Sequence, residues 1–499
     1  MNSIKITDNI SLKKLAEFFW KLEKEFDLIH YEINDVKVWQ YQRFRIFLTI
    51  ARQLGVFNHV HTKKTKFLEI LSAAPSLLYN SIFSNPILGN YNKETLVFSS
   101  GRKIKVNEWF IDIYTEYFID KLKNGSFEII EELYLNRHLP SETKNRKHQD
   151  YQQISTFLKS KLSIFKLNKK QLLFISEIEK FIKTKLGAEI NLKTLFRNGY
   201  LTFKNDFEFY NKLIRKRKPT KIFLICSYGY KMALVAAAKQ NQVETIEIQH
   251  GTVNKYHLGY SYPNHSYIDY FPDKIYFWSE YWKNCMHFPL AEENKFVSGF
   301  PYFRNQKERF QGVSKIPKQV LIISQGTIGN QLSEFIWKSR DVLKNYKVIY
   351  KLHPGEFDRW VNEYPCLNKL NELDNISIID NNNSNLYSYL AKSEFVVGVY
   401  STAVYEALSF NCKVILADLP GVEFLDDFMT RFTNVKYEPR KMNQKGLTIR
   451  GFNWRKNEFG GLEMIKLEFF RKTSYKTIKS SFFSTKDIVV NESETLQCY

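Results

Sequence analysis

A histidine followed directly by a proline is the feature of this sequence with the clearest chemical use. His353 and Pro354 come after a strand-like run at residues 348–352. A proline restricts the preceding residue to extended backbone, which fixes the direction of the His353 imidazole. A histidine held at the end of a buried strand can donate to a phosphate or to the oxygen that leaves with it. The alternative is a histidine satisfied by backbone carbonyls in a turn.

A loop of small residues offers a second contact to the same anion. Residues 324–329 read Ser-Gln-Gly-Thr-Ile-Gly and follow an apolar run at residues 320–323. Small side chains at Ser324, Gly326 and Thr327 let backbone N–H groups approach an anion, and a helix that begins after them adds a favourable dipole. Glycine is also common in strand-to-helix turns for steric reasons, so the segment has an ordinary structural interpretation as well.

A pair of hydroxyls offers a third contact. Ser401 and Thr402 follow an apolar run at residues 395–399 and enter a helical stretch. Either hydroxyl can cap that helix, so hydroxyls and unpaired N–H groups converge at the positive end of a helix, which suits a phosphate. Glu406, about one helical turn further on, could accept from ribose hydroxyls. Plain capping without a ligand explains Ser401 and Thr402 equally.

A second histidine lies earlier in the chain. His250 stands between Gln249 and Gly251, after a strand-like run that begins at Thr245. Glycine permits a sharp turn that exposes the ring, and a neutral histidine there could remove a proton from an acceptor hydroxyl. A histidine satisfied inside the core is the alternative. The carboxylates that could act as the base instead are Asp269, Asp273 and Glu280.

The segments that carry these residues alternate between strand and helix. In the second half, strands are predicted at 320–323, 348–352, 376–379, 395–399 and 414–417, with a helix at 402–410 and another capped by Asn330. In the first half, strands are predicted at 96–99, 127–130, 222–226, 245–249 and 274–277, with an alanine-rich helix at 231–239. Strand, helix and strand with short connections indicate parallel sheets, which bind ligands at the carboxyl ends of their strands. The sequence therefore predicts an α/β protein with two doubly wound domains and a cleft between them.

Helical and loop segments surround this alternation. Residues 10–55 and 66–83 are predicted to be helical, and residues 141–218 are lysine-rich and mostly helical. A loop at 299–317, rich in Pro, Gly, Asn and Lys, marks the predicted domain boundary. The segment at 66–83, beside a basic tract at 61–66, could lie on an anionic bilayer. A buried helix next to a solvated turn explains it too.

Bulk properties narrow the class of protein. A chain of 499 residues is expected to form two or three domains. It has no uncharged apolar run of about 18 residues and no export signal, so we expect a cytoplasmic protein.

The net charge of +21 favours a polyanionic neighbour, although an AT-rich genome would also enrich lysine. No nucleic-acid motif accompanies the charge, so nucleic acid is disfavoured. The scattered cysteines, which lack metal-ligand spacing and are expected to be reduced, are Cys226, Cys285, Cys366, Cys412 and Cys498.

The order of these motifs resembles that in a group of bacterial transferases. The segment Lys-Leu-His-Pro ending at Pro354, followed by Tyr-Ser-Thr ending at Thr402, resembles sialyltransferases and Kdo transferases that use CMP-activated sugars. In those families the His-Pro histidine and the Ser/Thr pair hold the nucleotide phosphate. The segment Gln-His-Gly-Thr from Gln249 resembles the Trp-His-Gly-Thr motif of CDP-glycerol glycerophosphotransferases of teichoic acid synthesis. The resemblance covers residues 222–423 and extends to capsule and O-antigen biosynthesis proteins.

This resemblance implies a GT-B glycosyltransferase, with two Rossmann-like domains, an interdomain cleft and a helical N-terminal elaboration. It implies an acceptor-side domain at 1–305, a nucleotide-sugar-binding domain at 306–445, and a helical or irregular segment at 446–499 that packs back on the first domain. The implied reaction needs no metal or cofactor. It moves a sugar from a nucleotide-sugar, with a CMP- or CDP-linked donor and in particular a CMP-sugar favoured, to a polysaccharide, oligosaccharide or lipid-linked acceptor. The implied location is cytoplasmic, with peripheral contact at the anionic inner face of the plasma membrane.

Other functions fit the same residues. A CDP-glycerol or CDP-ribitol transferase would move a polyol phosphate, and a degenerate transferase-like domain would be a non-catalytic assembly partner. An epimerase acting on a UDP-sugar shares this architecture, but the sequence shows no carboxylate-rich site resembling one. For the leading interpretation we predict catalytic roles for His250 and His353. The residues predicted to bind the substrate or nucleotide are Ser324, Gly326, Thr327, Pro354, Ser401, Thr402, Glu406, Gln249 and Gly251.

Overall fold

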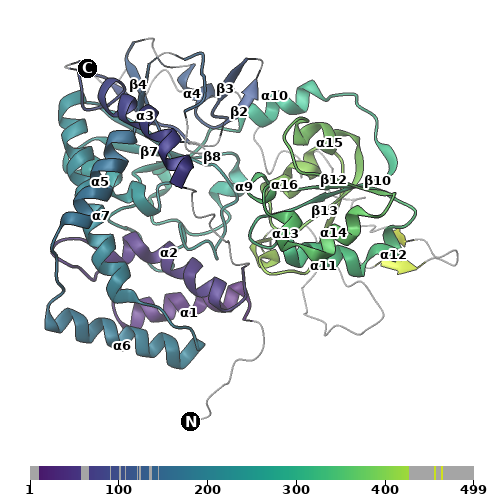
Figure 1. Ribbon diagram of the computed structural model, residues 1–499, viewed down its shortest axis with the longest axis horizontal. Coiled ribbons are helices and arrows are strands. Elements are labelled where there is room, and N and C mark those ends of the chain that lie inside the picture. Colours follow the sequence, from purple (N-terminus) through teal and green to yellow (C-terminus); the bar gives the residue numbers. More distant parts are fainter. Residues whose placement is uncertain are drawn as a thin grey trace.

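The protein is described here by a computed structural model (Figure 1). The structure describes residues 10–57, residues 67–425 apart from 90, 101–102, 107, 121, 123–124, 134–137 and 144, and residues 427, 454–456 and 462–464. For residues 67–74 it describes the backbone alone. Two parallel sheets from separate parts of the chain form the framework, and helices flank both. The predicted α/β class with two doubly wound sheets is therefore confirmed.

The first sheet is built from the N-terminal part of the chain. Its strands are β1 Thr95–Phe98, β4 Phe127–Glu131, β5 Arg146–His148, β6 Lys221–Ile225, β7 Glu244–Ile248, β8 Lys274–Phe277 and β9 Lys295–Val297. They run parallel in the order β5-β4-β1-β6-β7-β8-β9. Val97 of β1 pairs with Ile129 on one side and Phe223 on the other. Because both faces of such a sheet are covered, the central strands β1 and β6 are largely apolar without alternation, whereas β5 at the edge is polar.

The second sheet repeats the same winding. Its strands are β10 Ile316–Ile323, β11 Lys347–Lys351, β12 Ile376–Ile379, β13 Ser393–Gly398 and β14 Lys413–Leu416. They run parallel in the order β12-β11-β10-β13-β14. In each sheet the chain starts at a central strand, adds two strands on one side, and then crosses to the other side. That crossing opens a crevice at the carboxyl ends of the central strands, which lies between β1 and β6 in one sheet and between β10 and β13 in the other.

Helices cover the sheets and form an N-terminal elaboration. Those of the first part are α1 Leu12–Glu25, α2 Val38–Gln53, α3 Phe67–Phe83, α4 Glu116–Ile119, α5 Asp150–Leu162, α6 Lys169–Leu186, α7 Leu192–Arg217, α8 Met232–Gln240 and α9 Glu280–Lys283. Those of the second part are α10 Pro301–Arg309, α11 Gly329–Lys338, α12 Arg340–Leu343, α13 Trp360–Glu363, α14 Pro365–Asn371, α15 Leu386–Lys392 and α16 Thr402–Ser409. A small antiparallel hairpin of β2 Ile104–Val106 and β3 Trp109–Ile111 follows β1.

The N-terminal helices brace the loop that follows His250. Arg43 of α2 lies 2.6 Å from the Glu23 carboxylate of α1 and also donates to the carbonyl of Leu258. Its guanidinium stacks 4.1 Å from the ring centroid of Tyr262. All of these groups are buried. The elaboration is therefore tied by charge and hydrogen bonds to the carboxyl side of the first sheet.

Three local predictions differ from the structure. The helical region at 10–55 is two helices, because the turn between them places Asn34 and Asp35 at φ 46° and 68°. The loop predicted at 299–317 contains α10, which Pro301 starts at the first helical position, where its missing N–H costs nothing. Asn330 lies inside α11 and donates to Glu334 at 3.0 Å, while Ile328 occupies the cap position.

Two further predictions concern segments that lie partly or wholly outside the described residues. The basic tract at 61–66 lies outside the described residues. Of the segment at 446–499, only β15 Trp454–Lys456 and β16 Leu462–Met464 are described, and they form an antiparallel pair where helical or irregular structure was expected. Within the part of the chain that the structure describes, none of the helices has the length and apolarity needed to cross a bilayer.

Candidate functional site

The loops that follow β10, β11 and β13 meet at the carboxyl edge of the second sheet. Ser324 Oγ, after β10, donates to Glu356 Oε1 at 2.9 Å after β11. The backbone N–H of Tyr400, after β13, donates to Gln325 Oε1 at 3.1 Å, and the Tyr400 hydroxyl lies 2.5 Å from Thr327 Oγ1. The segments that the sequence singled out separately are thus joined by hydrogen bonds at one place.

His353 is held in a fixed orientation at this edge. Its backbone is extended, with φ −72° and ψ 144°, which confirms the restriction expected from Pro354. Nδ1 accepts from the N–H of Gly355 at 3.1 Å, so the neutral ring carries its proton on Nε2. A Cβ added at Gly326 would lie 3.8 Å from Nδ1, which places the ring beside the 324–329 loop. The ring therefore caps the short turn that starts at Pro354, and the same turn fixes the direction of its Nε2–H.

A buried carboxylate occupies the start of α11. Glu356 is fully buried, and a Cβ at Gly329 would lie 1.9 Å from its Oε1, so glycine is required for this close approach. Burial raises the pKa of Glu356. The hydrogen bonds from the His353 N–H, Ser324 and Tyr364 act in the opposite direction, but burial has the larger effect. The positive end of α11 is therefore already close to an internal anionic group. At the start of α16 the cap acceptor is instead the hydroxyl of Ser401.

The start of α16 shows capping by a hydroxyl. Ser401 Oγ accepts from the N–H of Ala403 at 3.2 Å, and Thr402 is the first helical residue. Ser401 and Thr402 are partly exposed. Glu406 is buried one turn further on, where it accepts from the Tyr387 hydroxyl at 2.9 Å. Burial raises the pKa of Glu406 to about 7.

Two basic side chains that the sequence argument did not use lie in the same region. Arg359 donates to the carbonyl of Gly326 at 2.6 Å. Lys351, the last residue of β11, donates to the carbonyl of Asn381 at 2.6 Å, and burial lowers its pKa to about 8. The position of Lys351 two residues before His353, at the end of a buried strand, was the signal that could have marked it.

The second predicted histidine lies at the carboxyl edge of the first sheet. His250 Nδ1 is 3.4 Å from the Tyr260 hydroxyl and 3.8 Å from Glu247 Oε1. The Tyr260 hydroxyl also donates to Glu247, which is buried, and burial raises the pKa of that carboxyl. The His250 side chain itself is 24% exposed. A partly exposed imidazole backed by a tyrosine and a buried carboxyl can take up a proton and hold it.

The neighbours of His250 have structural partners. Gln249 donates to the carbonyl of Gly251 at 2.8 Å and accepts from the N–H of Trp278 at 2.9 Å, so it links β7 to β8. The backbone of Gly251 is not left-handed, and among the described residues nothing lies within 4 Å of an added Cβ. The chain bends at Gly251, but the bend does not require glycine. Asp273, one of the alternative bases, accepts from the backbone N–H and hydroxyl of Thr245 at the opposite, amino-terminal edge of the sheet.

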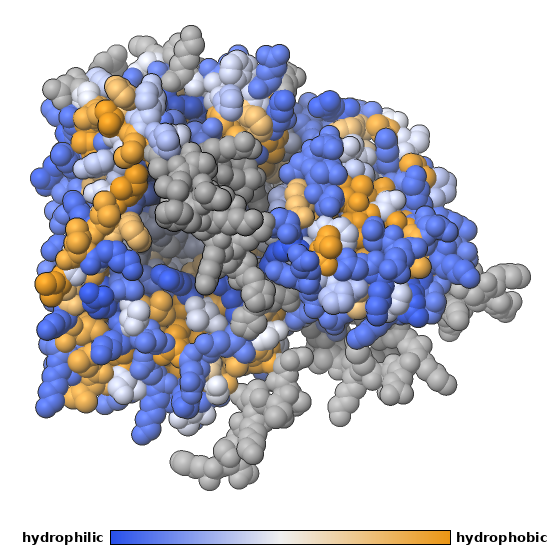
Figure 2. Space-filling view, in the orientation of Figure 1, coloured by the Kyte–Doolittle hydropathy of each residue, from blue (hydrophilic) through white to orange (hydrophobic). Residues whose placement is uncertain are grey.

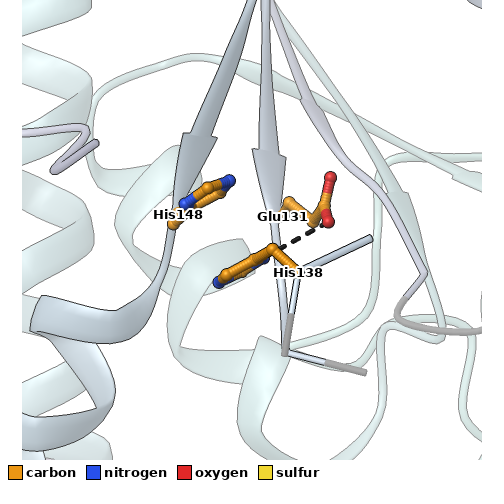
Figure 3. A group of neighbouring side chains, drawn as sticks. All are labelled: Glu131, His138 and His148. Carbon is orange, nitrogen blue, oxygen red and sulfur yellow. Dashed lines mark hydrogen bonds and ion pairs between the residues drawn. The ribbon is translucent and has the colours of Figure 1, made fainter. Parts of the chain in front are cut away.

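A cluster of charged groups that the sequence argument missed closes the other half of this edge (Figure 3). Glu131, the last residue of β4, lies 2.6 Å from Lys103 Nζ, 3.1 Å from Arg146 and 3.2 Å from His138. Burial alone would raise the pKa of Glu131, but the hydrogen bond from His138 and the charges of Lys103 and Arg146 lower it to about 2. No local motif announces this cluster, because its members come from separate loops and strands.

The two histidines of this cluster are stacked on each other. Their ring centroids are 3.6 Å apart with planes at 6°, and His138 Nε2 lies 2.7 Å from Asp150. The ligand atoms of Glu131, His138 and His148 lie within 4.8 Å of one another, which is close enough for a metal ion. A ligated metal lies near the plane of each imidazole, and two parallel planes this far apart share no such point. As arranged, the group is an ion-pair network that fixes the end of β4.

The same network shifts the pKa values of two histidines in opposite directions. Burial alone would lower the pKa of His138, but hydrogen bonds to Asp150 and Glu131 raise it. Burial and the nearby charge of His138 lower the pKa of His148 to about 4. A further sign of constraint lies across the crevice, where Cys226, the residue directly after β6, has φ 61°. Strained backbone of this kind in a non-glycine residue gathers at functional sites.

Comparison with known proteins gives likeness in fold at low identity. The structure of UDP-GlcNAc 2-epimerase from Methanocaldococcus jannaschii in complex with UDP-GlcNAc and UDP is 13% identical, with 67% of this chain and 86% of that chain covered and a TM-score of 0.38. The UDP-GlcNAc 2-epimerase of Neisseria meningitidis bound to UDP-GlcNAc is 13% identical, with 68% and 90% covered and a TM-score of 0.36.

A glycosyltransferase from Rickettsia africae is 14% identical to the chain, with 66% of this chain and 81% of that chain covered and a TM-score of 0.35. No protein-family model matches the sequence, and no curated protein matches it. At this identity and these TM-scores the likeness does not extend to activity.

Proposed function

We propose that this chain is a metal-independent glycosyltransferase that moves a sugar from a nucleotide-sugar, with a CMP-sugar favoured, onto a surface polysaccharide or glycolipid acceptor. The observation that supports it most is the meeting of the loops after β10, β11 and β13 at one sheet edge, through Ser324, Thr327 and Tyr400. That edge combines a helix start, a fixed imidazole and backbone N–H groups, which together suit a phosphate.

The donor phosphate would lie between the start of α16 and His353. The N–H groups at the start of α16 and the hydroxyls of Ser401 and Thr402 face the anion, and the helix dipole favours negative charge there. His353 donates from Nε2 to the phosphate oxygen that gains charge as the bond to the sugar breaks. These donors would supply the stabilisation that a divalent ion gives in other transferases.

The acceptor hydroxyl would approach from the first sheet. His250 accepts its proton as the acceptor oxygen forms a bond to the anomeric carbon and the bond from that carbon to the phosphate oxygen breaks. The nucleotide leaves with the phosphate. Tyr260 and Glu247, within 3.4 Å and 3.8 Å of His250 Nδ1, would stabilise the imidazolium that results. The buried links of Gln249 to β8 hold this loop in place.

The setting we propose for the reaction is capsule or lipopolysaccharide assembly on the cytoplasmic side of the membrane. An oligosaccharide or lipid-linked acceptor and peripheral contact with an anionic inner membrane belong to that proposal. The formal charge of +21 supports contact with such a surface.

The test measures nucleotide binding and transfer together. Titration calorimetry with CMP, CDP and UDP identifies the base, and transfer from the corresponding activated sugars identifies the reaction. We expect His353→Ala to lose at least about 100-fold in turnover, because one donor to the developing charge is removed. The control is His30→Ala, at an exposed histidine that pairs with Asp27. Full turnover by His353→Ala would contradict the assigned site.

A polyol-phosphate transferase is the second candidate, favoured by the Gln-His-Gly-Thr segment that starts at Gln249. The same phosphate-binding edge would then hold CDP-glycerol or CDP-ribitol, and the product would carry a phosphodiester in place of a glycosidic bond. Phosphorus analysis of the product separates the two reactions. Epimerised UDP-sugar, or the absence of any nucleotide-dependent thermal shift, would set both transferase proposals aside in favour of an epimerase or a non-catalytic partner.

A further inference from the structure

Two neighbouring helices of the first part expose large apolar side chains on one face. Figure 2 shows them as a hydrophobic band over α3 and α5 along the left edge of the view. Leu162 is 80% exposed and Ile164 is 91% exposed. The exposed apolar side chains of this docking face are Leu78, Tyr79, Ile82 and Phe83 on α3 and Phe157, Leu158 and Leu162 on α5, followed by Ile164. Single exposed apolar residues are ordinary, but a continuous group of this size marks an interaction surface.

Polar contacts on the inner side hold the two helices together. Asn80 of α3 is buried and donates to Asp150 of α5 at 3.3 Å. The N–H of His148, just before α5, donates to the carbonyl of Ser84 at 2.8 Å, just after α3. The helices are therefore positioned by their inner faces, and the outward apolar side chains are not needed for that packing.

The two chain segments that form this face carry exposed charge of a single sign. Residues 75–89 contain no charged side chain, and residues 151–173 contain no Asp or Glu. The lysines of the second stretch are all exposed and are Lys159, Lys161, Lys166, Lys169 and Lys170. Lysine stems lie along apolar surface while their ammonium groups reach outward. Apolar side chains with a collar of lysines, and without acidic groups, match the acyl boundary and the phosphates of an anionic bilayer.

We propose that the face formed by α3 and α5 docks on an anionic lipid bilayer. The lysine collar argues for lipid over a second copy of this chain, because two such faces would bring like charges together. The proposal deepens the membrane contact included in the proposed function by naming its surface. The docking itself does not depend on transferase activity.

The docking face is connected to the sheet edge that carries His250. Asp150, which anchors Asn80 of α3, lies 2.7 Å from His138, and His138 lies 3.2 Å from Glu131 at the end of β4. Buried charged groups thus join the surface helices to the carboxyl edge of the first sheet. A docked molecule would hold that edge at a fixed orientation to the bilayer, which suits an acceptor attached to lipid.

The test is flotation of the full chain with vesicles of phosphatidylcholine, with and without phosphatidylglycerol. We expect binding to the anionic vesicles and much weaker binding to the neutral ones. Because each lysine near such a surface contributes about fivefold in affinity, Lys159→Glu with Lys161→Glu should reduce binding more than about 25-fold. Phe83→Ser with Leu162→Ser should abolish binding to both vesicle types.

Matched variants separate docking from general effects of charge and apolarity. Lys338→Glu with Lys344→Glu reverses two exposed lysines near the second sheet, and Val361→Ser removes an exposed apolar side chain there. These controls should float like the unchanged protein. Equal flotation of both sets of variants, or self-association in sedimentation that the α3 and α5 variants remove, would overturn the bilayer proposal. CMP titration of each variant reports on the nucleotide site separately, so loss of docking with intact nucleotide binding leaves the proposed function standing.

Discussion

The carboxyl edges of the two sheets have the same topology and opposite chemistry. Each lies where the chain crosses from one side of the first strand to the other. The edge of the first sheet is closed by buried ion pairs, of which Glu131 with Lys103 and Arg146 is the centre. The edge of the second presents a helix start at Ser401 and the imidazole of His353. Strand order decides where a crevice opens, and the side chains of the loops decide what it can bind.

This difference divides the roles that we propose for the two edges. Fixed charges and a histidine backed by Glu247 suit proton transfer and an uncharged acceptor. Backbone N–H groups and a helix dipole suit an anion, because they attract it without bringing a counter-charge of their own.

The largest expected effect on stability is at the first edge. Glu131→Gln leaves Lys103 and Arg146 buried beside a neutral amide, and breaking a buried ion pair costs about 3–5 kcal/mol of unfolding free energy. Urea unfolding at neutral pH measures it. Glu142→Gln, at an exposed glutamate, is the control and should change stability by less than about 0.5 kcal/mol. A loss below about 1 kcal/mol at Glu131 would show that the network does not hold this edge together.

The next effect is a pH dependence with opposite signs at the two edges. The pKa of Glu406 is about 7 in the folded protein against an ordinary 4.5, so between these values the folded state binds more protons than the unfolded state. Stability should therefore fall by about 3 kcal/mol as pH rises through that window and stay level above it. The lowered pKa of Glu131 acts the other way, since its contribution is present above pH 4.5 and is lost as pH falls toward 2.

The Glu406→Gln variant isolates this contribution. It should be more stable than the unchanged protein at pH 8 and should lose the slope between pH 4.5 and 7, because the amide keeps a hydrogen bond with Tyr387 without carrying charge. Thermal unfolding across the pH range measures it. An unchanged slope would mean that Glu406 does not titrate in this window.

The smallest effect separates capping from ligand binding at the second edge. Ser401→Ala should cost about 1 kcal/mol of stability, because an N-cap hydrogen bond is lost. The control is Asn168→Ala, which removes the cap of α6 with a similar cost. If Ser401 also contacts the phosphate, nucleotide affinity should fall more than about tenfold in its variant alone. Equal affinities in the two variants would leave Ser401 as a cap only.

Most strands of the two sheets were predictable because buried parallel strands are short apolar runs bounded by turns, whereas the short edge strands β5 and β9 were not predicted. The run expected at 222–226 is β6 at Lys221–Ile225, and the run expected at 395–399 is β13 at Ser393–Gly398. The helix α10 was missed because its sequence, Pro-Tyr-Phe-Arg-Asn-Gln-Lys-Glu-Arg, is polar and starts with proline. Its apolar positions pack in tertiary contacts, such as Tyr302 against Tyr387 of α15.

The sequence predicted which loops form the candidate site, but it did not predict which side chains those loops contact. Residues just after the strands were expected to converge, and the contacts of Ser324, Thr327 and Tyr400 show that they do. No local pattern indicated that Glu356, two residues after Pro354, would be buried at the start of α11. Likewise nothing near Glu131 in the sequence indicated that Lys103 and Arg146 would neutralise it.

What the sequence by itself determined is the alternation of strand and helix, and with it the edges at which loops gather. These follow from short-range periodicity and from proline and glycine, whose effects act within a few residues. Only the tertiary structure decided which helix start holds an internal carboxylate, which histidine has a raised pKa, and which apolar side chains of α3 and α5 stay outside. Those outcomes depend on burial and on charges that distant segments bring together, so no local pattern encodes them.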